Sequence, residues 1–426
     1  MSRPPTRRRR RSPKSKPRPV CRRLEIGELG HRGDGVAETD GGRVFVPFTL
    51  AGEVVEAGVA GDRGVLKVIV HPSPERVDPP CPRFGACGGC AVQHLAADAY
   101  AEWKRGLVAA ALGRRDLDAD VEALIDAHGA GRRRATLHVR GDGAARRVGF
   151  MAARSHDLVD IEGCLVLAPE LAGAPEIAAA AARPFAGAVD VQITATESGL
   201  DADVRTVGGL DYDAQVALAD LAERFDLARV TLAGEIVAER RKPWLAMGTA
   251  RVTPPPAGFL QATAAGEAAL ADLVTSHLAG AARVADLHAG VGPFALRLAG
   301  EAAVHAVDSD EAALAALGQA VRFTQNLKPV TTEVRDLDAN PLLADELRSF
   351  DGVVFDPPRA GARAQAEQLA AAAVPRVAAV SCDPSSFARD AAILAAGGYG
   401  LERVQPVDQF KHSAHVEIVG LFRRGP

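Results

Sequence analysis

Residues 284–300 read VADLHAGVGPFALRLAG and combine three features in one short segment. The apolar residues around Asp286 predict a short buried strand, and Gly290 and Gly292 follow it in a turn. The Ala- and Leu-rich residues after the turn predict a helix. Glycines between a strand and a helix let the backbone approach a ligand closely. The segment therefore predicts a ligand-binding unit, with a plain turn as the alternative interpretation.

The same rhythm of strand, turn and helix continues through the C-terminal part of the chain. Ala- and Leu-rich helical stretches at 310–321 and 362–374 separate short runs of Val, Ala and Phe. This alternation predicts an α/β fold with a parallel, doubly wound, Rossmann-like sheet. The predicted strands are 283–287, 303–308, 352–356, 377–382 and 415–422.

Acidic residues mark the carboxyl ends of these strands, which is where a doubly wound sheet binds its ligands. Asp286, Asp308 and Asp356 all fall at or near such ends. Asp308 follows Gly292 by 16 residues, where a carboxylate can accept hydrogen bonds from both hydroxyls of a ribose. A dinucleotide and S-adenosylmethionine both carry such a ribose. Phe294 stands near the position of the third glycine of the dinucleotide fingerprint, which favours S-adenosylmethionine.

Two further segments carry candidate catalytic groups. Cys382 ends a predicted strand in AAVSCDPSSFARD, where Ser385 and Ser386 are candidate N-caps of the next helix. A helix N-terminus lowers the pKa of a nearby thiol. Glu417 stands inside an apolar run, where a carboxylate costs free energy unless it is paired or functional. A packed cysteine and an ion-paired glutamate are the alternative interpretations.

A thiol and a carboxylate together suit methylation of C5 of a pyrimidine. This carbon is too electron-poor to attack a methyl sulfonium unaided, but addition of a thiolate to C6 makes it an enolate carbon. A base must then remove the C5 proton so that the thiolate can leave. In FDPPRAG (355–361), tandem prolines prevent a helix from starting and keep Asp356 at the strand tip. Similar loops also serve methylation of exocyclic amino groups.

The order of the motifs GFLQAT, DLHAGVG, DPPRAG, SCDPSSFARD and FKHSAHVE resembles the RNA (uracil-5)-methyltransferase family, whose members make 5-methyluridine in tRNA and 23S rRNA. The resemblance implies a class I S-adenosylmethionine-dependent methyltransferase fold, with Cys382 as the nucleophile and Glu417 as the base. The resemblance also implies that Gln261, Gly290, Asp308 and Asp356 contact or flank the cofactor, and the strand and turn positions of Asp286 and Gly292 add these two residues to the predicted cofactor site.

The chain departs from the family pattern at a few positions. The family usually has Asn where this chain has Asp383, and Tyr-Cys where it has His288 and Ala289. Pro293 replaces a common Thr. An aspartate beside the nucleophile would oppose ionisation of the thiol unless its charge is paired. The departure at Asp383 therefore bears on the rate of the reaction.

The cysteines indicate a metal site. The chain has no secretion signal, which favours metal binding or catalysis over disulfides. Cys81, Cys87 and Cys90 lie close together in CPRFGACGGC, and Cys164 in DIEGCLVL is the natural fourth ligand. This spacing leaves zinc and a [4Fe–4S] cluster open. The family resemblance implies a [4Fe–4S] cluster with a structural role.

The remaining sequence predicts four regions. Residues 1–23 contain 11 Lys and Arg and no acidic residue, which predicts a disordered tail that binds RNA or only aids solubility. Short apolar runs with Asp-Gly turns at 24–72 predict a small β-barrel, which resembles an OB-like TRAM domain. Residues 73–254 form a predicted middle α/β domain that holds the cysteines and binds RNA, and residues 255–426 form the catalytic domain.

The sequence thus predicts an enzyme that methylates C5 of an unstacked uridine in RNA. The barrel and the cluster favour 23S rRNA over tRNA. The alternatives are a tRNA uridine methyltransferase, an amino-group methyltransferase with a packed Cys382, and an RNA-binding module without activity. Trp103 and Lys104 are candidate RNA contacts. The chain has no apolar run of about 20 residues, so we expect a cytoplasmic protein without membrane contact. No obligate protein partner is evident from the sequence.

Overall fold

The computed structural model describes residues 18–207, 209 and 211–425, and the basic segment 1–17 lies outside them. The chain divides into two compact units, Met1–Asp78 and Pro79–Pro426. No helix within the described ranges has the length and apolar content that crossing a membrane requires. The division into tail, barrel, middle domain and catalytic domain stays a prediction.

The first unit is an all-β structure. Its strands are β1 (Val20–Glu25), β2 (Glu28–Leu29), β3 (Asp34–Thr39), β4 (Gly42–Pro47), β5 (Val54–Ala60) and β6 (Arg63–His71). They pair in the order β1-β5-β6-β4-β3-β2 around a small core that includes Val44, Val46 and Val55. Strand β1 begins inside the segment predicted as a tail, because Val20 pairs with Val59 of β5 and the register continues along both strands.

The second unit begins with the cysteine segment, helix α1 (Ala97–Gly113) and a mixed sheet. The elements of this region are β7 (Ile125–Asp126), β8 (Arg134–Arg140), β9 (Arg147–Met151), β10 (Leu158–Val159), α2 (Ala174–Ala181), β11 (Val189–Thr196), β12 (Gly199–Thr206), α3 (Tyr212–Arg224), β13 (Arg229–Leu232) and β14 (Glu235–Glu239). The sheet order is β10-β9-β8-β11-β12-β13-β14, and α2 and α3 pack on it around Leu137, Val191 and Val204. A hairpin of β15 (Leu245–Met247) and β16 (Ala250–Val252) follows.

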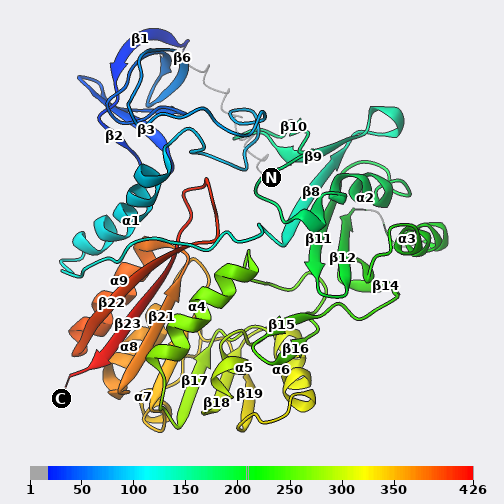
Figure 1. The fold of residues 1–426 in the computed structure, drawn as a ribbon, viewed down its shortest axis with the longest axis vertical. Coiled ribbons are helices and arrows are strands. Elements are labelled where there is room, and N and C mark those ends of the chain that lie inside the picture. The colour runs from blue at the N-terminus through cyan, green and yellow to red at the C-terminus, as the bar shows by residue number, and fades with distance from the viewer. Residues whose placement is uncertain (1–17, 208, 210, 426) are drawn as a thin grey trace, which may run out of the picture. The chain divides into compact units, whose positions relative to one another are not determined.

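The C-terminal region of the second unit is a doubly wound sheet (Figure 1). Its strands pair in the order β19-β18-β17-β20-β21-β23-β22-β7. Its strands from β17 to β21 are parallel, whereas β23 runs antiparallel to both β21 and β22. The elements are α4 (Ala264–His277), β17 (Arg283–Leu287), α5 (Ala295–Leu298), β18 (Ala303–Asp308), α6 (Glu311–Phe323), β19 (Val330–Val334), α7 (Ala344–Leu347), β20 (Gly352–Phe355), α8 (Arg363–Ala372), β21 (Arg376–Ser381), α9 (Pro384–Ala396), β22 (Tyr399–Asp408) and β23 (Glu417–Arg424).

Alternate residues of each strand enter two separate cores, one on each face of this sheet. On one face, Val284 and Val354 pack with residues of α4, α5 and α6. On the other face, Leu287 and Phe355 pack with residues of α1, α7, α8 and α9. Because side chains alternate along a strand, a strand covered by helices on both faces is apolar throughout. This explains why the central strands β20 and β21 appear in the sequence as almost continuous apolar runs.

The doubly wound fold predicted from the sequence is confirmed, with one correction. The five predicted strands correspond to β17, β18, β20, β21 and β23 within about two residues at each end. The prediction that the sheet is parallel is wrong for β23. Residues 409–416 join β22 to β23 without a crossover helix, so the last strand returns antiparallel. Strands β19 and β22 were not predicted, because β19 is polar and β22 contains charged residues and Pro406.

Candidate active site

Three neighbouring strand tips bring Asp356, Cys382 and Glu417 to one edge of the doubly wound sheet. Asp356 directly follows β20 and Cys382 directly follows β21. Glu417 is the first residue of the antiparallel β23, so it lies at the edge where β20 and β21 end. Ser381 pairs with Ile418, which aligns the next residues, Cys382 and Glu417, across the strand pair. The predicted nucleophile and base are therefore brought together.

A chain of side-chain hydrogen bonds joins the two carboxylates of this edge. Gln261 precedes α4 and is buried; its Nε2 donates to Asp356 Oδ2 at 2.9 Å. Its Oε1 accepts from Gln409 Nε2 at 2.6 Å. Gln409 Nε2 also donates to Glu417 Oε1 at 3.1 Å. The predicted site residue Gln261 thus contacts Asp356 directly and reaches Glu417 through Gln409.

Burial and mutual repulsion set the protonation of these groups. Burial raises the pKa of the Asp356 and Glu417 carboxyls, and the charge of Asp356 raises the pKa of Glu417 further. Burial also raises the pKa of the Cys382 thiol to about 11, with smaller contributions in the same direction from Glu417 and Asp356, while Arg359 acts against them. The thiol is therefore neutral near pH 7 in the free protein, and its ionisation requires nearby positive charge.

The charge of Asp383, which lies beside the predicted nucleophile, is paired in the structure. Its side chain is the N-cap of α9, where Oδ1 accepts the backbone N–H groups of Ser385 at 2.9 Å and Ser386 at 3.1 Å. Its other oxygen lies 3.5 Å from the guanidinium of Arg359. The prediction that Ser385 or Ser386 caps the helix is wrong. Pro384 is the first helical residue, so both serines already belong to the first turn.

The glycine turn after β17 forms the second part of the site. Both glycines have left-handed backbone angles, with φ of 52° at Gly290 and 88° at Gly292. A Cβ at Gly292 would lie 2.4 Å from a methyl carbon of Leu317, whereas a Cβ at Gly290 would meet open space. Asp308 Oδ2 accepts the backbone N–H of Gly290 at 2.8 Å. The predicted cofactor residues Gly290 and Asp308 are therefore in direct contact, and Gly292 is needed for packing against α6.

Asp286 differs from the other predicted cofactor residues because it is fully buried. Its Oδ2 accepts the backbone N–H of Ala295, the first residue of α5, at 2.8 Å. Its Oδ1 is buried and has no hydrogen-bond partner among the described residues. Burial raises the pKa of Asp286 well above its ordinary value. Asp286 therefore ties the strand to the helix behind the glycine turn and keeps one oxygen for a further donor.

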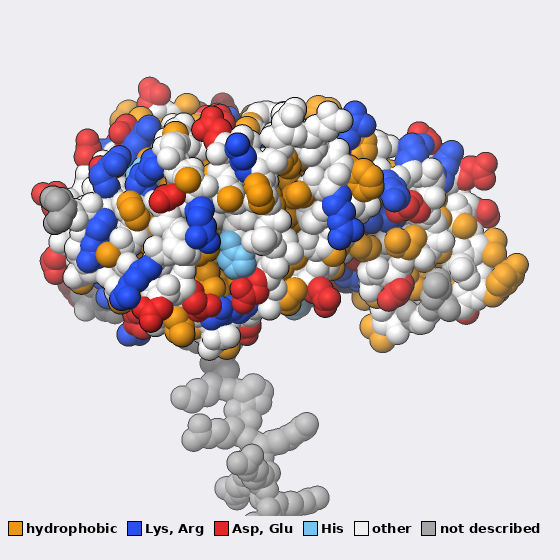
Figure 2. Space-filling model, turned by 90° about the horizontal axis from the view of Figure 1, so that it is seen from below, with side chains coloured by type: hydrophobic (Ala, Val, Ile, Leu, Met, Phe, Trp, Pro, Cys, Tyr) orange, Lys and Arg blue, Asp and Glu red, His pale blue; other side chains and the backbone are white. Residues whose placement is uncertain are grey.

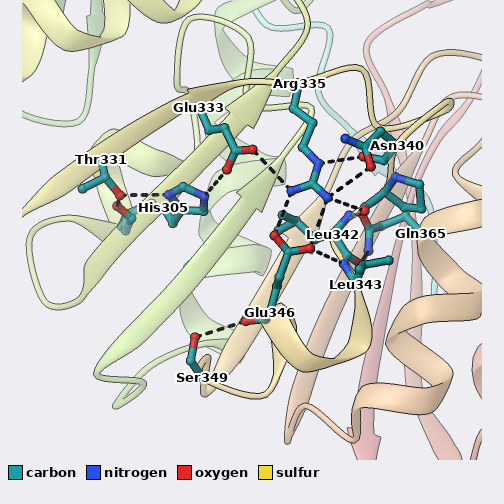
Figure 3. A network of polar contacts seen from close by, with 12 residues as sticks. His305, Thr331, Glu333, Arg335, Asn340, Leu342, Leu343, Glu346, Ser349 and Gln365 are labelled. Atoms are coloured by element: carbon teal, nitrogen blue, oxygen red, sulfur yellow. Dashed lines mark hydrogen bonds and ion pairs between the residues drawn. The ribbon is translucent and has the colours of Figure 1, made fainter.

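The segment after β19 is fixed at the same edge of the sheet by Arg335. Its guanidinium pairs with Glu333 and Glu346, and it also donates to the backbone oxygen of Asn340 (Figure 3). Carboxylates on this segment act on His288 of the glycine turn, although burial dominates and lowers the pKa of its imidazole. The network of Arg335 thus holds the loop that adjoins the glycine turn.

A buried lysine anchors the loop between β22 and β23. The Lys104 side chain of α1 is 0% exposed, and its Nζ pairs with Asp408 and donates to the carbonyl oxygen of His415 at 2.6 Å. Tyr100 of the same helix donates its hydroxyl to Asp408 at 2.6 Å. Burial lowers the pKa of Lys104 to about 8, against the opposing effect of Asp408. The hypothesis that Lys104 touches RNA is wrong, because the side chain has no exposed surface.

Sequence reasoning missed the roles of Gln409 and Lys104, although Lys104 left a signal. It lies four residues after Tyr100 and four before Val108, on the helical stripe that α1 buries. A lysine on such a stripe requires a buried partner. Gln409 left no comparable signal, because a polar residue at a strand end is ordinary.

The four predicted metal ligands meet at one cavity. Cys81, Cys87, Cys90 and Cys164 line it together with Arg132. Burial raises the pKa of Cys90 to about 11 and also raises the pKa of Cys164. Within the described part of the chain, no three His, Cys, Asp or Glu side chains converge closely enough to hold a single metal ion. The structure brings the cysteines together, and the nature of a bound metal stays a prediction.

Comparison with known proteins gives the family. No protein-family model matches the chain. An uncharacterized RNA methyltransferase of Brucella suis is 46% identical over 406 residues, which cover 94% of this chain and 98% of the relative. The chain belongs to the RNA methyltransferase family. A 23S rRNA (uracil(1939)-C(5))-methyltransferase of Halomonas elongata belongs to the same set of relatives, with 35% identity over 443 residues that cover 93% of this chain and 88% of that protein.

A solved structure confirms the predicted fold. The tRNA (uracil-54, C5)-methyltransferase of Pyrococcus abyssi, crystallised with S-adenosyl-L-homocysteine, superimposes with a TM-score of 0.72. The match covers 94% of this chain and 99% of the other, at 24% sequence identity. The chain therefore has the methyltransferase fold expected from its strand-turn-helix pattern.

Proposed function

We propose that the protein transfers a methyl group from S-adenosylmethionine to C5 of a uridine in RNA, with 23S rRNA as the substrate. The observation that carries this proposal is the alignment of Cys382 with Glu417 at adjacent strand tips, beside Asp356. A thiol and a carboxylate on one edge are the nucleophile and the base that C5 methylation requires. The 35% identical relative named for uracil C5 of 23S rRNA supports the same chemistry.

Cys382 performs the first step in this proposal. The thiol loses its proton to water, and the thiolate sulfur bonds to C6 of the pyrimidine while the π electron pair of the C5–C6 double bond moves to C5 and makes it nucleophilic. Because the thiol is neutral in the free protein, positive charge must offset Glu417 and Asp356; Arg359 contributes one such charge. S-adenosylmethionine, when bound, supplies the methyl group and a positive sulfonium.

Glu417 performs the last step. It takes the proton from the methylated C5, the electron pair of that C–H bond forms the C5–C6 double bond, and the bond from C6 to sulfur breaks. The thiolate of Cys382 is then regenerated. Burial suits Glu417 to this task, because its raised pKa makes the carboxylate a stronger base than an exposed glutamate.

The residues around the glycine turn fit an S-adenosylmethionine molecule. Gly290 faces open space beside Asp308, so a ligand can approach the backbone there. Asp308 accepts one backbone hydrogen bond on each oxygen and retains lone pairs for ribose hydroxyls. The unpaired oxygen of Asp286 is a further polar group behind the turn that can form a hydrogen bond. Gln261 and Asp356 are hydrogen-bonded to each other near Cys382 and Glu417. We propose that these two side chains lie between the bound cofactor and the uridine.

We propose that the cavity lined by Cys81, Cys87, Cys90 and Cys164 holds a [4Fe–4S] cluster, because the four thiols meet there. In a zinc site four sulfurs meet at one ion, whereas each cysteine of a cubane cluster binds a different iron. We propose a structural role for the cluster. Neither step of the methyl transfer requires it.

We propose that RNA contacts several Lys and Arg side chains that lie apart from one another on the surface. On the face shown in Figure 2, Lys and Arg side chains are spread among Asp and Glu side chains. The distribution of charge alone therefore does not identify a single RNA-binding path on that face. The target uridine must leave its base stack so that Cys382 can reach C6.

The test of the substrate is a map of 5-methyluridine across rRNA and tRNA in cells that lack this gene. The proposal predicts the loss of 5-methyluridine at a position of 23S rRNA, restored by the wild-type gene and not by Cys382→Ala. Loss in tRNA alone would replace the rRNA assignment with a tRNA assignment. Loss of a methyl group on an exocyclic amine, with C5 unchanged, would refute the proposed chemistry.

A further inference from the structure

Gln409 connects the two carboxylates of the candidate active site through one buried amide. Its side chain is 0% exposed, and its Nε2 donates both to Gln261 Oε1 and to Glu417 Oε1. Its Oε1 accepts the backbone N–H of Thr263 at 3.3 Å. The two hydrogens and the oxygen of the amide therefore all have partners.

The partners fix the orientation of this amide. In the reversed orientation, the oxygen of Gln409 would face the acceptor oxygens of Gln261 and Glu417, and its NH2 group would face the N–H of Thr263. Buried polar groups without partners are strongly disfavoured. The orientation of the Gln261 amide is fixed in the same way. Its NH2 group donates to the Asp356 carboxylate, and its oxygen accepts from Gln409.

The surrounding structure encloses Gln409 on two sides. A Cβ at Gly266, in the first turn of α4, would lie 2.7 Å from Gln409 Oε1 and 2.8 Å from Gln409 Cβ. On the other side, Lys104 and Tyr100 hold Asp408, the residue directly before Gln409. Close packing against Gly266 and the hydrogen bonds to Gln261, Glu417 and Thr263 therefore hold the amide in this position.

We propose that Gln409 is a positioning residue for the methyl transfer, which occupies Oε1 of Glu417 and so leaves Oε2 as the oxygen that takes the C5 proton. The inference rests on the proposed function. If the proton bound Oε1 of Glu417, this oxygen would carry a hydrogen and would also have to accept the N–H of Gln409. The proton therefore binds Oε2, the C5–C6 double bond forms, and Cys382 leaves.

The pH dependence of the last step follows from the groups that face Glu417. These are Asp356 after β20, Cys382 after β21, Gln409 after β22 and Lys104 from α1. Burial and the charge of Asp356 raise the pKa of Glu417, whereas the Gln409 hydrogen bond and Lys104 lower it. Removal of the Gln409 donor destabilises the carboxylate, so the acid limb of the rate must move to higher pH.

The test compares Gln409→Leu with wild-type protein on two RNAs, one with uridine and one with 5-fluorouridine at the target. With 5-fluorouridine there is no C5 proton to remove, so the covalent adduct forms without the action of Glu417. We expect Gln409→Leu to form this adduct at a rate within about threefold of wild type. With uridine, we expect kcat to fall roughly tenfold or more, with accumulation of the methylated adduct and little change in the KM for RNA.

The matched control is Gln405→Leu on β22, the strand that ends directly before Gln409. Gln405 is buried, and its Nε2 donates to the carbonyl oxygens of Ala123 and Pro406, so the control removes a buried amide that does not touch the carboxylates. It should lower the melting temperature and leave the pH profile unchanged. Gln409→Met, which keeps an unbranched side chain without a donor, replaces Gln409→Leu if the latter does not fold.

Two results overturn the inference while leaving the proposed function intact. One is a Gln409 variant with a wild-type acid limb and no accumulated adduct on uridine RNA. The other is an equal shift of the pH profile in Gln405→Leu. If the wild-type protein forms no adduct with 5-fluorouridine RNA, both the inference and the proposed function are refuted.

Discussion

Lys104 permits a direct test of how helix α1 holds the loop that leads to Glu417, the proposed base. In Lys104→Met the chain keeps a long apolar side chain and loses the ammonium group that pairs with Asp408. Asp408 is 1% exposed, so its carboxylate remains buried, and among the described residues the Tyr100 hydroxyl and the backbone N–H of Phe410 are the donors that remain. Removal of one partner of a buried ion pair costs about 3–5 kcal/mol. We expect a loss of this size in the free energy of unfolding of the second unit.

A double-mutant cycle with Asp408→Asn isolates the ion pair. The single variants each leave one buried charge without its partner, whereas the double variant leaves neither. We therefore expect the cost of the double variant to be smaller than the sum of the single costs, by about 1–3 kcal/mol. The measurement is urea unfolding followed by circular dichroism, read for the transition of the second unit.

Arg363→Met on α8 is the control, because the Arg363–Glu367 pair is exposed and should contribute less than about 0.5 kcal/mol. The methyl-transfer rate of Lys104→Met should fall as well, since Lys104 also binds the carbonyl oxygens of Phe410 and His415. A loss below about 1 kcal/mol, or strictly additive single variants, would refute this account of the loop.

Three further predictions concern the same site. Glu417 has a raised folded-state pKa, so its contribution to stability is present below the ordinary carboxyl pKa and is lost as pH rises through the folded value. Inactive Glu417→Gln should therefore melt above wild type at pH 8 and lose this advantage at pH 4, and an equal difference at both pH values would contradict the assignment. Gly292→Ala should lower the melting temperature more than Gly290→Ala, because only the Cβ at 292 meets Leu317; equal effects in a thermal scan would argue against this packing. Asp383→Asn should retain the stability of α9 within about 0.5 kcal/mol and Asp383→Ala should lose about 1 kcal/mol in chemical unfolding, whereas equal losses would exclude the cap.

The strands that helices cover on both faces could be predicted from the sequence alone. Burial on two faces makes β17, β18, β20 and β21 largely apolar, so each can be recognised without knowledge of its neighbours. Their ends then place Asp308, Asp356 and Cys382 at one edge, because parallel strands end together. The direction of β23 was harder to predict from the sequence. The lack of a helix between residues 409 and 416 is nevertheless a signal that β23 returns antiparallel.

The contacts that orient the site lie between residues far apart in the chain. Gln409 meets Gln261 across 148 residues, and Lys104 meets Asp408 across 304 residues. No local periodicity encodes such pairs, because they depend on how the helices pack against the sheet. The capping error at Ser385 has a local cause: the proline at position 384 marks the first helical residue and so assigns the cap to Asp383.

The covalent bond between the protein and the pyrimidine is the central claim, and mass spectrometry tests it directly. The protein is incubated with S-adenosylmethionine and RNA that carries 5-fluorouridine, then digested with protease and nuclease. The account predicts one cross-linked peptide, with the methylated nucleotide on Cys382. Glu417→Gln should retain this product and Cys382→Ala should lack it. A cross-link at another residue, or methylation of ordinary RNA by Cys382→Ala at the wild-type rate, would contradict the account.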